Sequence, residues 1–223
     1  MDIAAVAFDL DDTLAVTTVD RATLLAESLD AVGAPPRSRQ AYLDAHADHL
    51  TAHSRAPVFE RLLDEADAET AVDGDALAEA YRTRINDALE PVPGVEAMLS
   101  TLRERYRIGL LTNGPVLAQR SKLRALGWTD AFDATLVTGE LQAGKPDAAA
   151  FDTLLDALDT DPSETVFVGD DVAADVCGAT EAGLRAVQVL YPGGPDPDPA
   201  AMAHVDRAEL AERLPGILDS RNC

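Results

Sequence analysis

Ile3-Ala-Ala-Val-Ala-Phe8, followed at once by Asp9-Leu-Asp-Asp-Thr-Leu14, is the stretch that decides the fold of this 223-residue chain. The apolar run is short and β-compatible, which is typical of a buried strand. An acidic cluster then stands where the strand ends, and open α/β sheets bind ligands at that edge. Because crowded carboxylates repel one another unless a cation or a proton joins them, the stretch predicts a nucleophile beside a hard metal ion.

The rest of the chain divides into a helical part and an alternating part. Residues 18–90 carry apolar side chains at helical spacing, whereas strands and helices alternate after Pro91-Val92-Pro93-Gly94. Repeated βα units predict a parallel sheet covered on both faces. We therefore expect an α/β protein with a Rossmann-like, doubly wound core (1–16 and 92–223) and a small all-helical cap (17–91). The cap would lie over the carboxyl edge of the sheet, since a structureless loop of that length is uncommon.

Individual elements follow from the same patterns. We expect helices near 24–32, 42–50, 59–66, 77–89, 95–106, 116–126, 148–158, 173–182 and 207–214. Further strands are expected at 107–111, 135–137, 165–168 and 186–190.

Composition narrows the class of protein. Hydrophobic residues make up 47% of the chain, which favours a globular protein. No stretch approaches the roughly 20 apolar residues of a membrane helix, and no signal-peptide pattern is seen. Since Cys177 and Cys223 do not form a disulfide framework, we expect a cytoplasmic protein, with monomer and homodimer both open.

The charge is strongly negative and evenly spread. The chain has 40 acidic and 18 basic residues, for a net charge of −22, and its lysines are Lys122 and Lys145 alone. Such a surface repels nucleic acids and anionic membranes. At about 1 M salt the screening length falls to about 3 Å, so we hypothesise a halophilic host. A high-GC genome would also favour Arg over Lys.

Four polar segments each follow a predicted strand. They are Asp9–Leu14, Thr112–Gly114, Gly144–Asp147, and Gly169–Asp171 with Asp175. In a parallel sheet these segments meet at one edge. Hydroxyl, amide and backbone N–H groups hold phosphoryl oxygens, and a lysine adds a point charge. Mg²⁺ is commonly bound by one or two carboxylates together with the phosphate of a substrate. One carboxylate can also attack phosphorus to form an aspartyl phosphate.

With these motifs, the chain resembles the haloacid dehalogenase (HAD) superfamily, in its phosphatase-type branch with a helical cap after the first motif. The matching motifs are Asp9-Leu10-Asp11-Asp12-Thr13, Thr112-Asn113-Gly114, Lys145-Pro146-Asp147 and Gly169-Asp170-Asp171-Val172-Ala173-Ala174-Asp175. The resemblance covers almost the whole chain and is weakest in the cap.

The resemblance implies a role for each motif residue. Asp9 would be the nucleophile, and Asp11 the general acid that later acts as base. Thr112, Asn113 and Lys145 would bind the phosphoryl group. Mg²⁺ would be held by Asp9, the Asp11 backbone carbonyl and Asp170, with Asp175 supporting the metal or orienting Lys145.

Other polar residues have simpler interpretations. Asp12 and Asp147 are expected to be structural, and Asp171 either a second metal ligand or a helix cap. His46, His49 and His53 have spacings compatible with a metal site on one helix face. Solvent-exposed histidines on an acidic helix are the preferred interpretation.

The resemblance implies a phosphatase that acts on a small phosphorylated metabolite, such as a nucleoside monophosphate, a sugar phosphate or phosphoglycolate. A 2-haloacid dehalogenase would also use Asp9, but Asp11 and Asp170 count against it. The same motifs are compatible with a sugar phosphomutase, whereas the complete set of acids counts against a protein that binds phosphate without catalysis.

Overall fold

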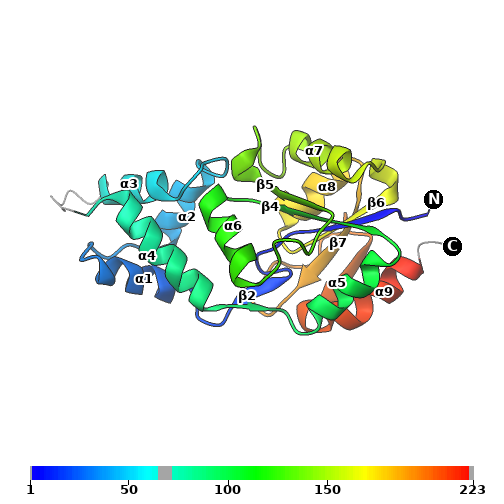
Figure 1. Ribbon diagram of the computed structural model, residues 1–223, viewed down its shortest axis with the longest axis horizontal. Coiled ribbons are helices and arrows are strands. Elements are labelled where there is room, and N and C mark those ends of the chain that lie inside the picture. The colour runs from blue at the N-terminus through cyan, green and yellow to red at the C-terminus, as the bar shows by residue number, and fades with distance from the viewer. Residues whose placement is uncertain (1, 65–71, 221–223) are drawn as a thin grey trace.

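A parallel sheet of six strands forms the centre of the computed structural model, which describes residues 2–64 and 72–220 (Figure 1). The strands run in the order β5-β4-β1-β6-β7-β8. Their bounds are β1 Ala5–Phe8, β4 Arg107–Thr112, β5 Ala134–Val137, β6 Thr165–Gly169, β7 Arg185–Leu190 and β8 Ala203–Asp206. Because β1 pairs with β4 and β6, the residue that follows it, Asp9, lies in the middle of the carboxyl edge.

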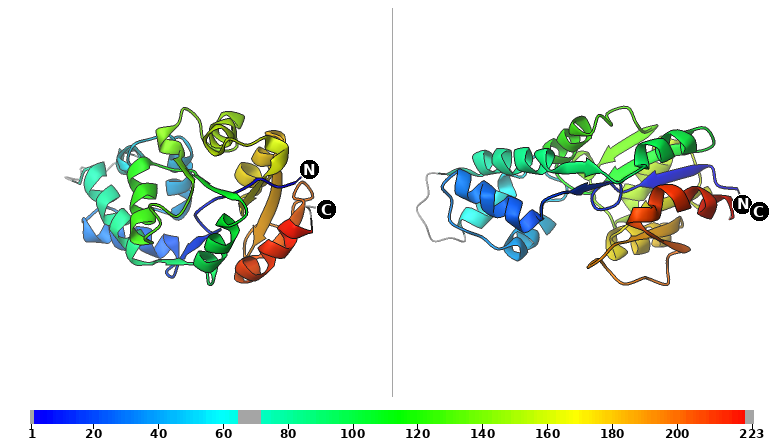
Figure 2. Two further views of the ribbon diagram at one scale, coloured as in Figure 1. Left: turned by 45° about the vertical axis from the view of Figure 1, so that its right-hand side comes forward. Right: turned by 90° about the horizontal axis from the view of Figure 1, so that it is seen from below.

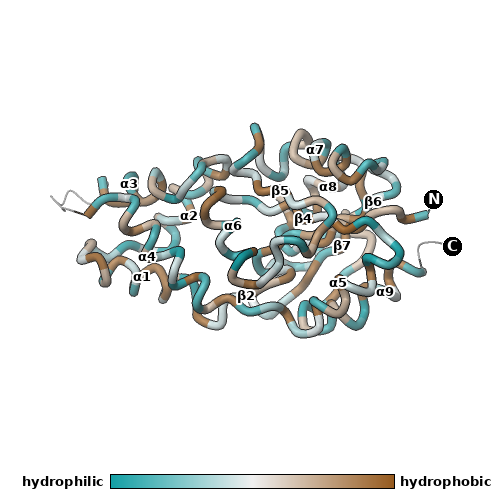
Figure 3. Tube along the Cα trace, viewed as in Figure 1, coloured by the Kyte–Doolittle hydropathy of each residue, from teal (hydrophilic) through white to brown (hydrophobic). Residues whose placement is uncertain are grey.

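Helices cover both faces of this sheet. The α5 (Val95–Arg103) and α9 (Leu210–Asp219) helices pack on the face that carries Val6 and Phe8 of β1. The α7 (Ala148–Leu158) and α8 (Gly178–Glu181) helices pack on the opposite face. A doubly wound parallel sheet requires two apolar faces. In Figure 3, hydrophobic colours mark much of the chain that forms β4, β6 and β7. The predicted fold class is confirmed.

Four helices form the other end of the molecule (Figures 1 and 2). They are α1 Arg21–Ala31, α2 Arg39–Ala47, α3 Ala56–Asp64 and α4 Gly74–Asp87. Their own apolar cluster centres on the rings of Tyr42, Phe59 and Tyr81, whose centroids lie 5.3–5.7 Å apart. We call these helices and their connecting loops the cap. The exact division at residues 17 and 91 stays a prediction.

The cap is joined to the sheet at two levels. Strands β2 (Ala15–Thr17) and β3 (Leu89–Pro91) pair antiparallel where the chain enters and leaves the cap. The loop between α2 and α3 then contacts the core. The carbonyl oxygen of Ala52 accepts from the Val116 N–H of α6 (Val116–Ala125) at 3.2 Å, and that of Leu50 accepts from the Thr138 hydroxyl at 3.0 Å. Val116 and Thr138 lie just beyond the carboxyl ends of β4 and β5, so the cap lies against the predicted edge.

Several short elements differ from the sequence predictions. Strands β2, β3 and β8 were not predicted, because these three or four residues include polar residues or proline and form no apolar run like that of β1. The expected helix 173–182 is instead a π-helical segment, Val172–Cys177 (η3), followed by α8. Three-residue 3₁₀ turns stand at Thr138–Glu140, Pro162–Glu164 and Arg207–Glu209. Residues 65–66 of the predicted third cap helix lie outside the described residues. In the described part of the chain, no helix is long and apolar enough to cross a membrane.

Candidate active site

The four polar segments meet at the carboxyl edge, as predicted from their places after strands. They line a cavity of about 190 Å³. Its lining residues are Asp9, Asp11, Asp12, Thr112, Asn113, Lys145, Asp170, Asp171, Ala174 and Asp175. Every residue named for the site from sequence therefore lies at one place, although the roles of these residues stay predictions.

Asp9 and Lys145 form the buried centre of this cavity. The backbone N–H of Asp9 donates to the Val168 carbonyl at 2.9 Å, which continues the β1–β6 ladder by one residue. The Lys145 ammonium donates to Asp9 Oδ1 at 2.8 Å and to Asp175 Oδ1 at 2.6 Å. Burial lowers the pKa of Lys145, but the charges of Asp175 and Asp9 outweigh it and hold that pKa above its ordinary value. Lys145 is thus a fixed positive charge beside Asp9.

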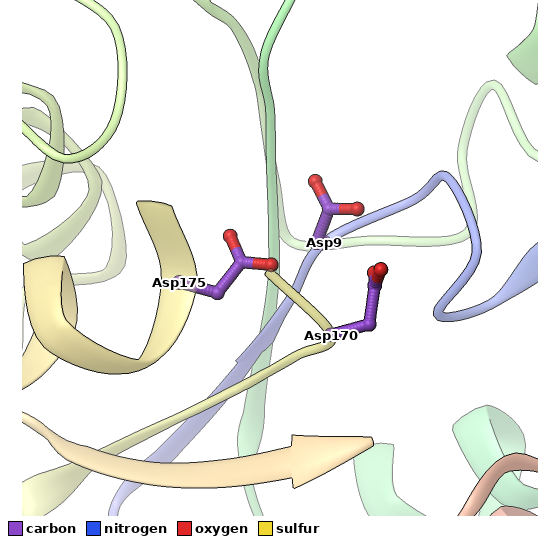
Figure 4. A group of neighbouring side chains, drawn as sticks. All are labelled: Asp9, Asp170 and Asp175. Atoms are coloured by element: carbon purple, nitrogen blue, oxygen red, sulfur yellow. The ribbon is translucent and has the colours of Figure 1, made fainter. Parts of the chain in front are cut away.

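Asp9, Asp170 and Asp175 form a group that can hold a metal ion (Figure 4). One carboxylate oxygen from each lies within 4.8 Å of the others. Burial raises the pKa of Asp9 to about 7 and, together with the charge of Asp9, raises the pKa of Asp170 to about 8. Burial also raises the pKa of Asp175. One lysine therefore faces three crowded carboxylates, and hard oxygen donors of this kind fit Mg²⁺.

The loop around Asp170 is shaped to hold these carboxylates in place. The Thr13 hydroxyl donates to Asp170 Oδ1 at 2.8 Å, and the Asp171 N–H donates to Asp175 Oδ2 at 3.1 Å. Gly169 leaves room for the Asp175 carboxylate, because a Cβ at that position would overlap it. The η3 segment begins here, and π-helical turns are frequent at functional sites.

Asp11 lies at the same cavity but points its carboxylate towards the cap side. It accepts from the Lys122 ammonium at 2.6 and 2.7 Å, from Arg21 at 2.8 Å and from the Gln119 amide at 2.9 Å. Burial raises the pKa of Asp11, but Lys122 and then Arg21 outweigh it and hold the pKa well below its usual range. In this arrangement Asp11 is an ionised carboxylate with a low affinity for a proton.

Two polar residues at the carboxyl end of β4, Thr112 and Asn113, are held by hydrogen bonds. Gln119 donates to the Thr112 hydroxyl oxygen at 2.6 Å, which leaves the Thr112 hydrogen free to reach a ligand. The side chain of Asn113 bonds twice to the backbone of Lys145, accepting from its N–H at 2.9 Å and donating to its carbonyl at 2.8 Å. Asn113 therefore fixes the lysine loop as well as lining the cavity.

Several remaining aspartates have structural contacts. Asp147 and Asp171 cap the helical segments that follow them, through bonds to Ala149 and Ala174 N–H. Asp12 adopts a left-handed backbone with φ of 61°, and its carboxylate faces Arg21 and Arg207. The structural interpretations of Asp147 and Asp12 agree with these contacts.

The expectation of exposed cap histidines is wrong for His46. Its ring stacks on Tyr42 with the centroids 5.5 Å apart, and its buried Nδ1 has no hydrogen-bond partner in the part of the chain that the structure describes. Burial, then the charges of Arg55 and Lys122, lower the pKa of His46 to about 3, so the ring is neutral. Among the described residues, the group of three that can hold a metal contains no histidine.

Sequence reasoning missed the partners of Asp11, namely Lys122, Arg21 and Gln119. One available signal was the scarcity of lysine. A chain with only two lysines singles out Lys122 as much as Lys145. Both are only 1–2% exposed, and each forms an ion pair with a carboxylate of the first motif.

Comparisons with known proteins identify the family of the chain. The family model for haloacid dehalogenase-like hydrolases matches residues 3–183. The N-acylneuraminate-9-phosphatase of Rattus norvegicus is 38% identical over 130 residues, which cover 58% of this chain and 52% of that protein. A ribulose-1,5-bisphosphate 5-phosphatase of Halopiger xanaduensis is 34% identical over 171 residues, covering 75% and 70%.

Solved structures show the same fold. A 2-haloacid dehalogenase from Pseudomonas syringae has a TM-score of 0.69 at 27% identity, over 96% of this chain and 99% of that one. The match spans about half the length of the Rattus norvegicus N-acylneuraminate-9-phosphatase. Since the family model covers residues 3–183, the chain belongs to the haloacid dehalogenase-like hydrolase family.

Proposed function

We propose that this protein is a Mg²⁺-dependent phosphatase that hydrolyses a small phosphomonoester through a phosphorylated Asp9. The observation that carries the proposal is the buried set of Asp9, Lys145, Asp170 and Asp175, with Thr112 at the same cavity. A nucleophilic carboxylate would repel an anionic phosphate unless positive charge stands beside both. Lys145 supplies one such charge, and a Mg²⁺ ion held by Asp9 and Asp170 would supply the rest.

The first step forms one bond and breaks another. An oxygen of the Asp9 carboxylate bonds to phosphorus, and the bond from phosphorus to the ester oxygen breaks. Lys145 and Thr112 hold the oxygens of the transferred group, while Asp11 gives a proton to the departing alcohol. Asp11 must carry a proton for this step, so its contacts with Lys122 and Arg21 have to loosen when substrate is bound.

The second step releases phosphate. Asp11, now a carboxylate, takes a proton from water, whose oxygen bonds to phosphorus as the bond to Asp9 breaks. In the structure Asp11 is ionised and positioned by three donors, and its basicity would rise as the contacts with Lys122 and Arg21 loosen. Acid–base help of this kind is typically worth roughly 10²–10⁴-fold.

The substrate class is part of the proposal. The rat relative is a phosphatase of N-acylneuraminate 9-phosphate and the Halopiger relative a phosphatase of ribulose 1,5-bisphosphate, both by name. We propose a phosphorylated metabolite of this size for the present chain, in the range from phosphoglycolate to sugar phosphates and nucleoside monophosphates. Cytoplasmic location and a halophilic host stay predictions.

A screen of phosphorylated metabolites, with p-nitrophenyl phosphate as a general substrate, tests the proposal. Hydrolysis should require Mg²⁺, should stop with EDTA, and should be lost in Asp9→Asn but kept in Asp152→Asn, a change at an exposed position of α7. Full activity of Asp9→Asn would exclude the proposed nucleophile.

The same screen separates the phosphatase from the two competing enzyme activities. Chloride release from a 2-haloacid in EDTA would indicate a dehalogenase. Retention of isotopically labelled phosphate in an isomerised sugar would indicate a mutase.

A further inference from the structure

The buried guanidinium of Arg55 is not explained by the chemistry above. Arg55 lies at the start of α3, where its carbonyl accepts from the Phe59 N–H at 3.2 Å. The residue is only 7% exposed, yet its buried Nε and Nη1 have no hydrogen-bond partner in residues 2–64 and 72–220. Buried charges are ordinarily paired, because an unpaired one keeps the full cost of losing water. A buried guanidinium with unsatisfied N–H groups is suited to bind an anionic ligand that accepts their hydrogen bonds.

Arg55 belongs to the cap loop that contacts the start of α6. The carbonyls of Ala52 and His53 accept from the N–H groups of Val116 and Leu117, at the start of α6. One face of the guanidinium stands 5.4 Å from the centroid of the Tyr81 ring, which fixes its direction. Arg55 thus belongs to a loop that contacts α6, the helix that also carries Lys122.

The neighbours of Arg55 include more cations than anions. Arg55 and Arg21 both lie close enough to Lys122 to disfavour its charge, and Asp11 is the carboxylate that Lys122 and Arg21 share. Arg39 also faces this cluster, with its guanidinium 4.8 Å from the Tyr42 ring centroid. In a chain with a net charge of −22, this local excess of positive charge is unusual and creates an attractive site for an anion.

We propose that Arg55, together with Lys122, binds a second anionic group of the substrate, a carboxylate or a second phosphate. This inference rests on the proposed phosphatase function and narrows its substrates to small phosphomonoesters with such a group. Arg55 does not line the cavity of Asp9, whereas Asp11, the partner of Lys122, does. A group held by Arg55 therefore lies further from Asp9 than the phosphoryl group, at the other end of a small molecule.

Matched substrates test the proposal. 3-Phosphoglycerate and glycerol 3-phosphate differ by a carboxylate in place of a hydroxymethyl group, and fructose 1,6-bisphosphate and fructose 6-phosphate differ by a second phosphate. At fixed KCl, we expect kcat/KM to favour the anionic member of at least one pair by about tenfold or more, as for hydrogen bonds to charged groups. The pair that shows the preference identifies the anion.

Arg55→Met should remove that preference. It should lower kcat/KM about tenfold or more for the anionic substrate and leave the neutral one within about threefold. Arg55→Lys should restore part of the preference. Arg82 is a cap arginine paired with Glu79, and Arg82→Met should leave kcat/KM unchanged for both substrates. The melting temperature of Arg55→Met should stay the same or rise, because an unpaired buried charge is lost. An equal loss on both substrates with a lower melting temperature would show a structural role and overturn the proposal.

A binding measurement separates this proposal from the phosphatase function. Asp9→Asn protein can be titrated calorimetrically with the same four compounds, with and without Arg55→Met. Tighter binding of an anionic member that depends on Arg55 supports the subsite, even if no phosphomonoester is hydrolysed. Equal affinity within both pairs would overturn the subsite, even if hydrolysis is found.

Discussion

The core side and the cap side of the site carry opposite charges, although two residues of one motif connect them. On the core side, Asp9 and Asp175 share Lys145, and one carboxylate oxygen of Asp170 lies within 4.8 Å of one from each of them. On the cap side, Lys122 and Arg21 share Asp11, and Nε and Nη1 of Arg55 have no hydrogen-bond partner among the described residues. Asp9 and Asp11 are two residues apart, so one short loop after β1 serves both environments. The difference suggests that the core side binds a cation and the reacting phosphate, and the cap side a second anion.

The two lysines give the most direct way to compare the two sides. Lys145→Met leaves Asp9 and Asp175 without their shared cation. We expect kcat to fall roughly 10²–10³-fold or more, as when one donor to a developing negative charge is removed. The free energy of unfolding should fall by about 3–5 kcal/mol at pH 8, since a buried pair loses one partner. Steady-state kinetics and urea unfolding measure both. Unchanged kcat would remove Lys145 from the phosphoryl site.

Lys122→Met should have a smaller effect, because Asp11 keeps Arg21 and Gln119 as partners. We expect kcat to fall about tenfold as the proton donor and base loses its position. The pKa of Asp11 should rise towards its ordinary value, which a carbon-13 NMR titration of the aspartates would follow. If Lys122→Met cost as much activity and stability as Lys145→Met, the two sides would not differ as described.

Stability should depend on pH through the core side. Burial raises the pKa of Asp9 to about 7 and of Asp170 to about 8, so the folded protein binds protons more tightly than the unfolded chain. That contribution is present at low pH and is lost as pH rises through 7 to 8. Without metal, the free energy of unfolding should fall by about 1–2 kcal/mol between about pH 6.5 and 8.

Mg²⁺ should oppose this fall, because the ion binds the same carboxylates without competing protons at pH 8. Thermal unfolding with Mg²⁺ and with EDTA at both pH values measures the effect, and Asp170→Asn should reduce it. His46 does not interfere in this window, since its lowered pKa affects stability only as pH falls below about 6.5. A larger Mg²⁺ effect at pH 6.5 than at pH 8 would contradict the assignment.

Salt should have the smallest effect, and it concerns the whole surface. With a net charge of −22, raising KCl to molar concentration should screen self-repulsion and raise the melting temperature by a few degrees, about 1 kcal/mol of stability. The buried Lys145 contacts should respond little to salt. A melting temperature that falls as KCl rises would remove the halophilic interpretation.

The site residues of the core side could be predicted from the sequence, whereas those of the cap side could not, for a physical reason. Thr112 is the last residue of a strand, and Asp9, Lys145 and Asp170 follow strands. Parallel strands bring such positions together whatever lies between them. Lys122 meets Asp11 from the middle of a helix 111 residues away, and only the packing of that helix decides the contact.

The same limit applies to Arg55. Its sequence neighbours suggest an exposed basic residue at the start of a helix, and its burial depends on the docking of the cap loop against α6. The helices of the cap were still predictable, because their apolar spacing is local. Strands β2 and β3 pair residues that are more than 70 apart and too few to show a pattern.

In the proposed reaction, Asp9 takes the phosphoryl group from the substrate. The most direct test is peptide mass spectrometry of Asp11→Asn protein, acid-quenched during turnover of p-nitrophenyl phosphate with Mg²⁺. This leaving group needs little help from an acid, whereas release of the phosphate needs the Asp11 base, so the intermediate should accumulate. We predict a hydroxylamine-sensitive phosphoryl group on the peptide that contains Asp9. A phosphoryl group on another residue, or continued turnover with no phosphorylated peptide, would contradict the account.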